Sequence, residues 1–169
     1  MLNEIGRQSN LQIYLLRHGI AENAAPGQPD SGRALTTEGK EKLRRVIRRA
    51  RAADVTLSLI LSSPYRRALE TAEIAAEALG YSEQIVQTAT LLPEAAPREA
   101  WEEIRSHRQE KAVLLASHEP LMSSLAAFLL RSPALQVDMK KAALVRIDCE
   151  SLGRDPSGTL KWMLTPGVA

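Results

Sequence analysis

Residues 11–19 read Leu-Gln-Ile-Tyr-Leu-Leu-Arg-His-Gly, a run of strand-forming apolar residues that ends in two polar side chains and a glycine. In open α/β sheets, ligands bind just beyond the carboxyl ends of the strands. A glycine at that point lets the backbone turn sharply and approach a ligand closely. An arginine beside a histidine suits chemistry on an anion, because the guanidinium grips oxygen atoms while the imidazole attacks. We therefore expect Arg17 and His18 to act on a phosphoryl group, with Gly19 in contact with the substrate.

Strands and helices alternate along the rest of the chain. The pattern predicts strands at 11–16, 57–61, 85–88, 112–116, 142–149 and 159–164, and helices at 36–52, 63–79, 97–108 and 120–130. Thr36 or Thr37 can cap the first helix, and Ser63 can cap the second with Pro64 in its first turn. The last two strands flank a turn-rich segment and are expected to form an antiparallel hairpin. This order of elements predicts a three-layer αβα sandwich with a mostly parallel central sheet.

Length and composition indicate one globular domain spanning residues 1–169, with ordinary hydrophobic and charged fractions of 44% and 25%. No apolar run is long enough to cross a bilayer, and the first ten residues lack the apolar core of a secretory signal. We therefore expect a cytoplasmic protein with no membrane partner. The net charge of +2 and the aromatic content of 4% argue against a nucleic-acid partner. The pattern specifies no oligomeric state.

Two further strand ends carry side chains of the same kind. One leads through 62–67, Ser-Ser-Pro-Tyr-Arg-Arg, into a helix, and the other through 116–120, Ala-Ser-His-Glu-Pro, into the next helix. Helix N-termini favour anions, because their N–H groups are unpaired and the helix dipole is positive there. If the three strands are neighbours in a parallel sheet, Arg67 and His118 join the first pair around one phosphoryl group. Phosphoryl transfer is catalysed mainly by such positioning and charge stabilisation.

The three segments together resemble the histidine phosphatase superfamily. The matching residues are Arg17-His18-Gly19, Ser63-Pro64-x-x-Arg67-Ala68-x-x-Thr71-Ala72 and Ser117-His118-Glu119-Pro120. The short chain is most similar to the small SixA-type phosphohistidine phosphatases. This resemblance implies an αβα sandwich and a phosphatase that uses neither a metal nor a cofactor. It also implies that the substrate is a phosphorylated protein, such as a phosphotransfer domain, or a small phosphorylated molecule.

The resemblance assigns roles position by position. His18 matches the nucleophile that becomes phosphorylated, and Arg17, Arg67 and His118 match the rest of the phosphate pocket. Arg33 resembles an arginine that contacts phosphate or substrate in this branch. Repulsion from Arg17 and Arg67 is expected to keep the attacking imidazole neutral, while a carbonyl fixes its tautomer.

The resemblance leaves two candidates for the residue that protonates the leaving group. Glu94 lies where many family members carry a general acid, and Glu22, just after the first motif, is a second candidate. A phosphohistidine releases an imidazole, for which a dedicated acid matters less than for an alkoxide. Two positions depart from the family pattern: Ser117 replaces a glycine, and Glu70 replaces a common glutamine.

Four other kinds of protein are alternatives to a phosphohistidine phosphatase. A small-molecule phosphomonoesterase is the alternative among enzymes, and a phosphate-binding regulatory module is the alternative outside them, although a pure binder needs no nucleophile. A cysteine phosphatase is disfavoured, because the spacing from Cys149 to Arg154 is one residue too short for its phosphate loop. With three histidines and no acidic cluster at ligand spacing, a metallophosphatase is also disfavoured. The basic helix face within 44–51 is expected to be solvated.

Overall fold

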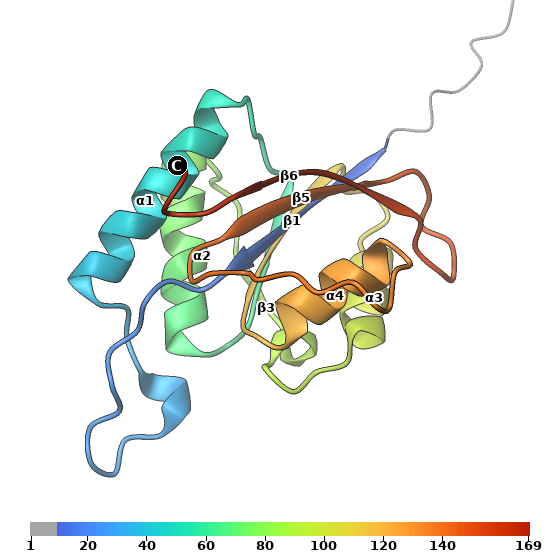
Figure 1. Cartoon of the computed structure of the whole chain (residues 1–169). Coiled ribbons are helices and arrows are strands. Elements are labelled where there is room, and N and C mark those ends of the chain that lie inside the picture. Colours follow the sequence, from blue (N-terminus) through green and yellow to red (C-terminus); the bar gives the residue numbers. More distant parts are fainter. Residues whose placement is uncertain (1–9) are drawn as a thin grey trace, which may run out of the picture.

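Figure 1 shows the computed structural model of the chain, which describes residues 10–169. The strands are β1 (Leu11–Arg17), β2 (Leu59–Ser62), β3 (Val86–Gln87), β4 (Ala112–Ser117), β5 (Leu144–Cys149) and β6 (Gly158–Leu164). The helices are α1 (Thr37–Ala52), α2 (Arg66–Leu79), α3 (Pro97–Ser106) and α4 (Leu121–Leu129), with short 3-10 turns η1 (Asp30–Gly32) and η2 (Ala89–Leu91). The predicted alternation of strands and helices is confirmed.

The six strands form one sheet in the order β3-β2-β4-β1-β5-β6. β1 runs parallel to β4 on one side and antiparallel to β5 on the other. β2 is parallel to both β3 and β4, and β5 pairs with β6 in antiparallel fashion. The predicted sheet, mostly parallel with an antiparallel C-terminal hairpin, is therefore confirmed.

The central strand β1 is buried on both faces, and its side chains alternate between two apolar layers. Ile13 and Leu15 belong to the cluster that includes residues of α3 and α4, whereas Tyr14 and Leu16 belong to the cluster with α1 and α2. All four side chains are fully buried. Successive strand side chains point to opposite faces, so an unbroken apolar run is typical of a strand covered on both sides. Figure 1 shows the resulting three layers, with helices on both faces of the sheet.

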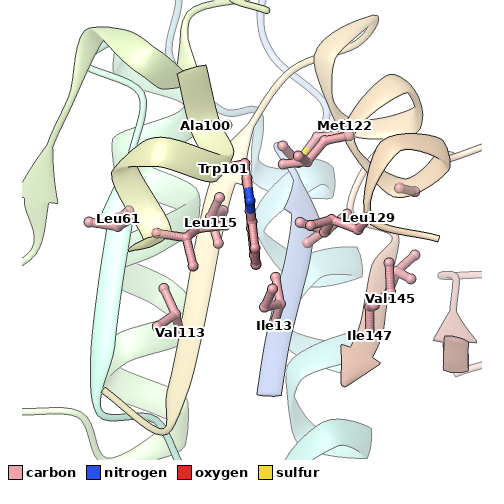
Figure 2. Close-up of a cluster of buried hydrophobic side chains, with 14 of the residues drawn as sticks. Ile13, Leu61, Ala100, Trp101, Val113, Leu115, Met122, Leu129, Val145 and Ile147 are labelled. Atoms are coloured by element: carbon pink, nitrogen blue, oxygen red, sulfur yellow. The ribbon is translucent and has the colours of Figure 1, made fainter. Parts of the chain in front are cut away.

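Figure 2 shows the apolar cluster between the sheet and the helices α3 and α4. Trp101 of α3 stands at its centre, with Leu115 of the sheet on one side and Met122 of α4 on the other. The indole Nε1 of Trp101 donates to the carbonyls of Gly153 and Arg154 at 3.2 and 3.1 Å. Its one polar atom is thus paired, as a buried indole requires, and it fixes the loop between β5 and β6 to α3.

The predicted start of α1 is confirmed, and that of α2 is wrong. Thr36 caps α1, its hydroxyl oxygen accepting a backbone N–H of the first turn at 2.9 Å. α2 begins only at Arg66, after Tyr65 in the cap position. Ser63 still belongs to the end of the sheet, because its N–H donates to the carbonyl of Ala116 at 2.9 Å. Its hydroxyl is bonded within the candidate site described below, so it does not cap the helix.

The helices show the amphipathic pattern expected of elements that cover a sheet. In α1, Leu43, Val46 and Ile47 are buried, at the spacing of one helical face. The arginines of the predicted basic face are all exposed: Arg44, Arg45, Arg48, Arg49 and Arg51. Within residues 10–169, none of the helices combines the length and the apolar character needed to cross a membrane.

Candidate active site

Three neighbouring strands end at the same edge of the sheet. β1 and β4 pair so that Arg17 lies opposite Ser117, and the N–H of His18 continues this pairing by donating to the Ser117 carbonyl at 2.9 Å. On the other side of β4, Ser63 continues β2 by donating its N–H to Ala116. The three polar segments found in the sequence therefore leave the sheet side by side, where α/β sheets bind their ligands.

Two histidines and an arginine meet at this edge. The rings of His18 and His118 lie 5.1 Å apart between centroids, and Nε of Arg67 lies 3.4 Å from Nε2 of His18. The three residues are 7%, 1% and 4% exposed, respectively. The ring of Tyr65 lies 5.1 Å from the His118 ring and 5.1 Å from the guanidinium carbon of Arg67. Polar groups buried together in this way are costly unless they are paired, so the cluster is suited to binding an anion.

The tautomer of His18 is fixed by its neighbour in the chain. Nδ1 of His18 lies 2.7 Å from the carbonyl oxygen of Gly19. A carbonyl oxygen can only accept, so Nδ1 carries the proton and Nε2 of the neutral ring keeps its lone pair. The N–H of Gly19 donates to Oγ1 of Thr71 at 3.2 Å, and this hydroxyl donates to the Arg67 carbonyl at 2.7 Å. Both backbone polar atoms of Gly19 therefore bond within the protein, the carbonyl to His18 and the N–H to Thr71, and its contact with substrate stays a prediction.

His118 is held differently. Its Nε2 lies 2.8 Å from Oγ of Ser63, and that oxygen also accepts the N–H of Tyr65 at 3.3 Å. Its Nδ1 is buried and has no partner among residues 10–169. Since buried polar atoms are almost always paired, this nitrogen is available to bond an atom of a ligand. Ser63 matched the second family motif and was predicted to cap a helix, but it was given no role in the site; its bond to His118 places it there.

Burial lowers the pKa of both histidines. The pKa of His18 falls to about 4, mainly because of burial, and its bond to Gly19 opposes the shift. The positive charges of Arg67 and Arg17 lower the pKa further, so the predicted repulsion is present but is not the main cause. The pKa of His118 falls to about 3, again mainly through burial. Both imidazoles are neutral at pH 7, which is the form that a nucleophile requires.

The free energy of unfolding is expected to fall as pH is lowered from about 6.5 to about 4. In this range the unfolded chain takes up a proton on His18 that the folded chain excludes, so acid favours unfolding. At 1.36 kcal/mol per pH unit, His18 alone accounts for about 3 kcal/mol. Urea unfolding at several pH values should therefore give a shallower pH dependence for His18→Gln than for the wild type. Equal slopes in the two proteins would contradict the low pKa.

Arg67 is fixed by a residue that the sequence analysis did not single out. Its Nη1 donates to the carbonyl of Asp30 at 2.8 Å, and its Nη2 donates to the Asp30 carboxylate at 2.9 Å. The other carboxylate oxygen of Asp30 accepts from Nε of Arg33 at 2.8 Å. Arg67 lies in the first turn of α2, where the helix dipole disfavours a cation, so helix stability does not explain its position. The η1 turn thus joins two of the predicted site residues.

Arg17 makes no hydrogen bond to either histidine within the described residues. Its Nη1 donates to the carbonyl of Met139 at 2.6 Å, and its buried Nε has no partner in residues 10–169. The side chain lines a cavity together with Lys42 and Lys141. Arg17 therefore influences His18 through its charge, and its contact with phosphate stays a prediction.

The two predicted proton donors are exposed. Glu94 follows η2 and Glu22 follows β1 in the loop toward η1. In the described part of the chain, the hydrogen bonds of His18 and His118 involve neither glutamate. The role of Glu94 as the acid therefore stays a prediction.

Glu70 and Ser117, the two residues that depart from the family pattern, form hydrogen bonds within the protein. The carboxylate of Glu70 accepts the N–H of Leu35 at 2.7 Å and Nε of Arg66 at 3.0 Å, one on each oxygen. A glutamine has a single acceptor oxygen, so the carboxylate suits this double role better. The hydroxyl of Ser117 donates to the carbonyl of Leu91 at 2.6 Å. Neither departure removes a side chain from the histidine cluster.

Two other reactive side chains lie away from this cluster. Burial raises the pKa of the Cys149 thiol to about 12, so at neutral pH it is the unreactive thiol rather than a nucleophilic thiolate. Nε2 of His107 lies 3.2 Å from a carboxylate oxygen of Glu103 on α3. Across residues 10–169, no three His, Cys, Asp or Glu side chains gather in a way that could hold a metal ion.

The sequence of this chain is similar to a family model and to sequences of known proteins. It matches the family model described as histidine phosphatase superfamily (branch 1) over residues 13–95. It is 31% identical over 137 residues to an uncharacterized protein of Picosynechococcus sp., covering 80% of this chain and 83% of that one. It is 27% identical over 162 residues to the phosphohistidine phosphatase SixA of Escherichia coli (strain K12), covering 92% and 94%.

A solved structure extends this likeness to the fold. The structure of the protein histidine phosphatase SixA complexed with tungstate matches with a TM-score of 0.81 at 26% identity, covering 93% of this chain and 98% of that one. The family match begins in the strand that carries Arg17 and His18, and it extends beyond Arg67. This chain belongs to the histidine phosphatase superfamily, in its SixA-type branch, and it is a phosphatase that works through a histidine nucleophile.

Proposed function

We propose that this phosphatase removes the phosphoryl group from phosphohistidine on a protein, through a phosphoenzyme formed at His18. The observation that carries the phosphoenzyme step is the tautomer of His18. Because Nδ1 donates to the Gly19 carbonyl, the lone pair lies on Nε2, next to the Arg67 guanidinium. His118 differs, since its Nε2 is already bonded to Ser63. The two histidines therefore have different roles, and His18 is the nucleophile.

The reaction takes two steps at phosphorus. In the first, Nε2 of His18 attacks in line and forms an N–P bond while the bond to the leaving group breaks. Once Nε2 bonds phosphorus, the Nε–H of Arg67, which faces that nitrogen, donates to a phosphoryl oxygen instead and stabilises its charge. The Ser63 hydroxyl can donate to Nε2 of His118, which leaves a proton on Nδ1 for another phosphoryl oxygen. In the second step, water attacks phosphorus, the N–P bond breaks, and inorganic phosphate leaves.

Phosphohistidine is favoured as the substrate because the carboxylate that bonds Arg67 cannot serve as a general acid. An alkoxide is a poor leaving group and needs an acid, whereas an imidazole needs less help. Burial acts to raise the pKa of Asp30, but hydrogen bonds from Arg67 and Arg33 outweigh it and lower that pKa. The carboxylate beside Arg67 is therefore ionised at neutral pH and has no proton to give. The similarity to the phosphohistidine phosphatase SixA supports the same substrate class.

Hydrolysis of a radiolabelled phosphohistidine on a phosphotransfer domain is expected to have a higher kcat/KM than hydrolysis of a sugar phosphate or p-nitrophenyl phosphate. EDTA is expected to leave all three rates unchanged, because the proposed steps need no metal. A higher kcat/KM for the sugar phosphate would support a small-molecule phosphomonoesterase instead. Loss of activity in EDTA that a divalent ion restores would refute metal independence.

The same assay in Glu94→Gln tests the proton donor. If Glu94 is the acid, monoester hydrolysis falls by about 10²- to 10⁴-fold, while phosphohistidine hydrolysis changes much less. Glu22→Gln is the matched control, because this exposed glutamate is the other candidate. Small and equal effects of Glu94→Gln on both substrates would show that Glu94 is not the acid. A large loss with phosphohistidine alone would contradict the assignment of the leaving group.

A further inference from the structure

We infer that Asp30 is a positioning residue of this phosphatase, which aims Arg67 at the nucleophile. Each carboxylate oxygen has a separate partner: Oδ2 accepts from Nη2 of Arg67, and Oδ1 accepts from Nε of Arg33. The Asp30 carbonyl oxygen accepts from Nη1 of Arg67 at 2.8 Å. The inference rests on the roles proposed above for His18 and Arg67.

The shape of the guanidinium group explains why fixing the two Nη nitrogens of Arg67 also sets the direction of its Nε–H. Its three nitrogens share one rigid plane with five N–H donors. Asp30 bonds both Nη nitrogens, while Nε lies 3.4 Å from Nε2 of His18. Fixing the Nη pair therefore fixes the direction of the Nε–H bond. Each Nη nitrogen keeps a second hydrogen, so donors remain for the oxygens of a phosphoryl group.

The exposure of the two side chains differs sharply across this ion pair. The Arg67 side chain is 5% exposed and that of Asp30 is 58% exposed. Asp30 therefore pairs with the guanidinium from the solvent side, where water screens the interaction. An ion pair with one partner this exposed adds little to stability, commonly less than about 1 kcal/mol. The main effect of losing Asp30 is therefore expected in the reaction and not in folding.

The contacts of Asp30 indicate that it positions Arg67 and does not compete with the substrate for it. A carboxylate that competed with the phosphoryl group would occupy the space between Arg67 and His18. Asp30 instead bonds the two Nη nitrogens and leaves Nε to face the imidazole. Removing the carboxylate is therefore expected to weaken anion binding, because the guanidinium loses its direction.

Asp30→Ala is expected to lower kcat by up to about 10²-fold, the scale for a small misplacement of a catalytic group, and to weaken inhibition by vanadate. Asp30→Glu is expected to recover part of the loss. Asp155→Ala is the matched control, because the Asp155 side chain is 57% exposed and pairs with Arg98 at the same kind of distance, 2.8 Å. The control is expected to keep wild-type kcat, and both alanine variants are expected to keep the wild-type Tm within a few degrees.

A double-mutant cycle tests whether Asp30 acts through Arg67. In an Arg67→Ala background, Asp30→Ala is expected to cause no further loss of kcat/KM. A full additional loss in that background would overturn the inference. So would a kcat of Asp30→Ala as high as that of Asp155→Ala, or tighter vanadate binding by Asp30→Ala than by the wild type. The His18→Ala variant separates the two proposals. Near-normal turnover by His18→Ala would contradict the proposed function itself. If His18→Ala is inactive and Asp30→Ala has wild-type activity, only the role of Asp30 is contradicted.

Discussion

Replacing His18 with alanine is expected to reduce kcat by a factor on the order of 10⁶, the scale seen when a covalent nucleophile is removed. Nε2 of His18 is the nitrogen that we propose to form the bond to phosphorus. His118 does not share this arrangement, because its Nε2 is bonded to Ser63. The fold is expected to persist, because the core residues of β1 precede His18 and keep their packing. Rapid quenching with radiolabelled substrate measures the phosphoenzyme, which is expected in the wild type and absent in the variant.

The third histidine of the chain provides the control. His107 ends α3, paired with Glu103 and outside the histidine cluster. His107→Ala is expected to form phosphoenzyme and turn over like the wild type. Near-normal turnover by His18→Ala, or label found on His118, would contradict the assignment of the nucleophile.

Replacing Arg67 with alanine is expected to cost about 3 kcal/mol of transition-state stabilisation, as for the loss of a donor that meets developing charge. This corresponds to a fall in kcat/KM of about 10²-fold. Arg67→Lys is expected to recover only part of this, because an ammonium cannot bond Asp30 with two nitrogens while a third faces His18. Steady-state kinetics and vanadate inhibition measure both variants, and vanadate is expected to bind each more weakly.

A substitution of the adjacent Arg66 tests whether Arg67 acts through its position or only through its positive charge. Arg66 carries the same charge one residue earlier, but its side chain is 58% exposed and pairs with Glu70. Arg66→Ala is therefore expected to stay within a few-fold of wild-type kcat/KM. An equal loss in both variants would mean that Arg67 acts only through net charge. A structure in which tungstate binds away from His18 and Arg67 would refute the proposed pocket.

Local sequence patterns predicted the elements that depend on neighbouring residues. The apolar residues within 11–16 predicted a strand, and the continuous stretch 13–16 is fully buried, as expected for a strand covered on both faces. Of the two predicted caps of the first helix, Thr36 and Thr37, the structure uses Thr36. Gly80 ends α2 in the left-handed conformation that glycine favours, with a φ of 70°. These outcomes are set within a few residues, so the sequence alone contains them. A single domain and a cytoplasmic location stay predictions.

The position of the histidine cluster was predicted only on the condition that three strands are neighbours. The sheet order places β4 between β2 and β1, which brings Arg67 and His118 to His18. Chain order does not give this arrangement, because β4 enters the sheet between two strands that precede it in the chain. The resemblance to a known family supplied what the pattern of strands alone left open.

The alternating elements of the αβα sandwich and the residue types at its strand ends follow from local sequence. How those residues are used depends on the packing of the whole chain. Ser63 was predicted as a cap from its neighbours, but its hydroxyl bonds His118 across 55 residues of chain. Asp30 bonds Arg67 across 37 residues, and no periodic pattern encodes such a contact. Burial, which only packing creates, is the main reason why His18 is neutral. Periodicity and caps depend on adjacent residues, whereas partners and burial depend on the path of the whole chain.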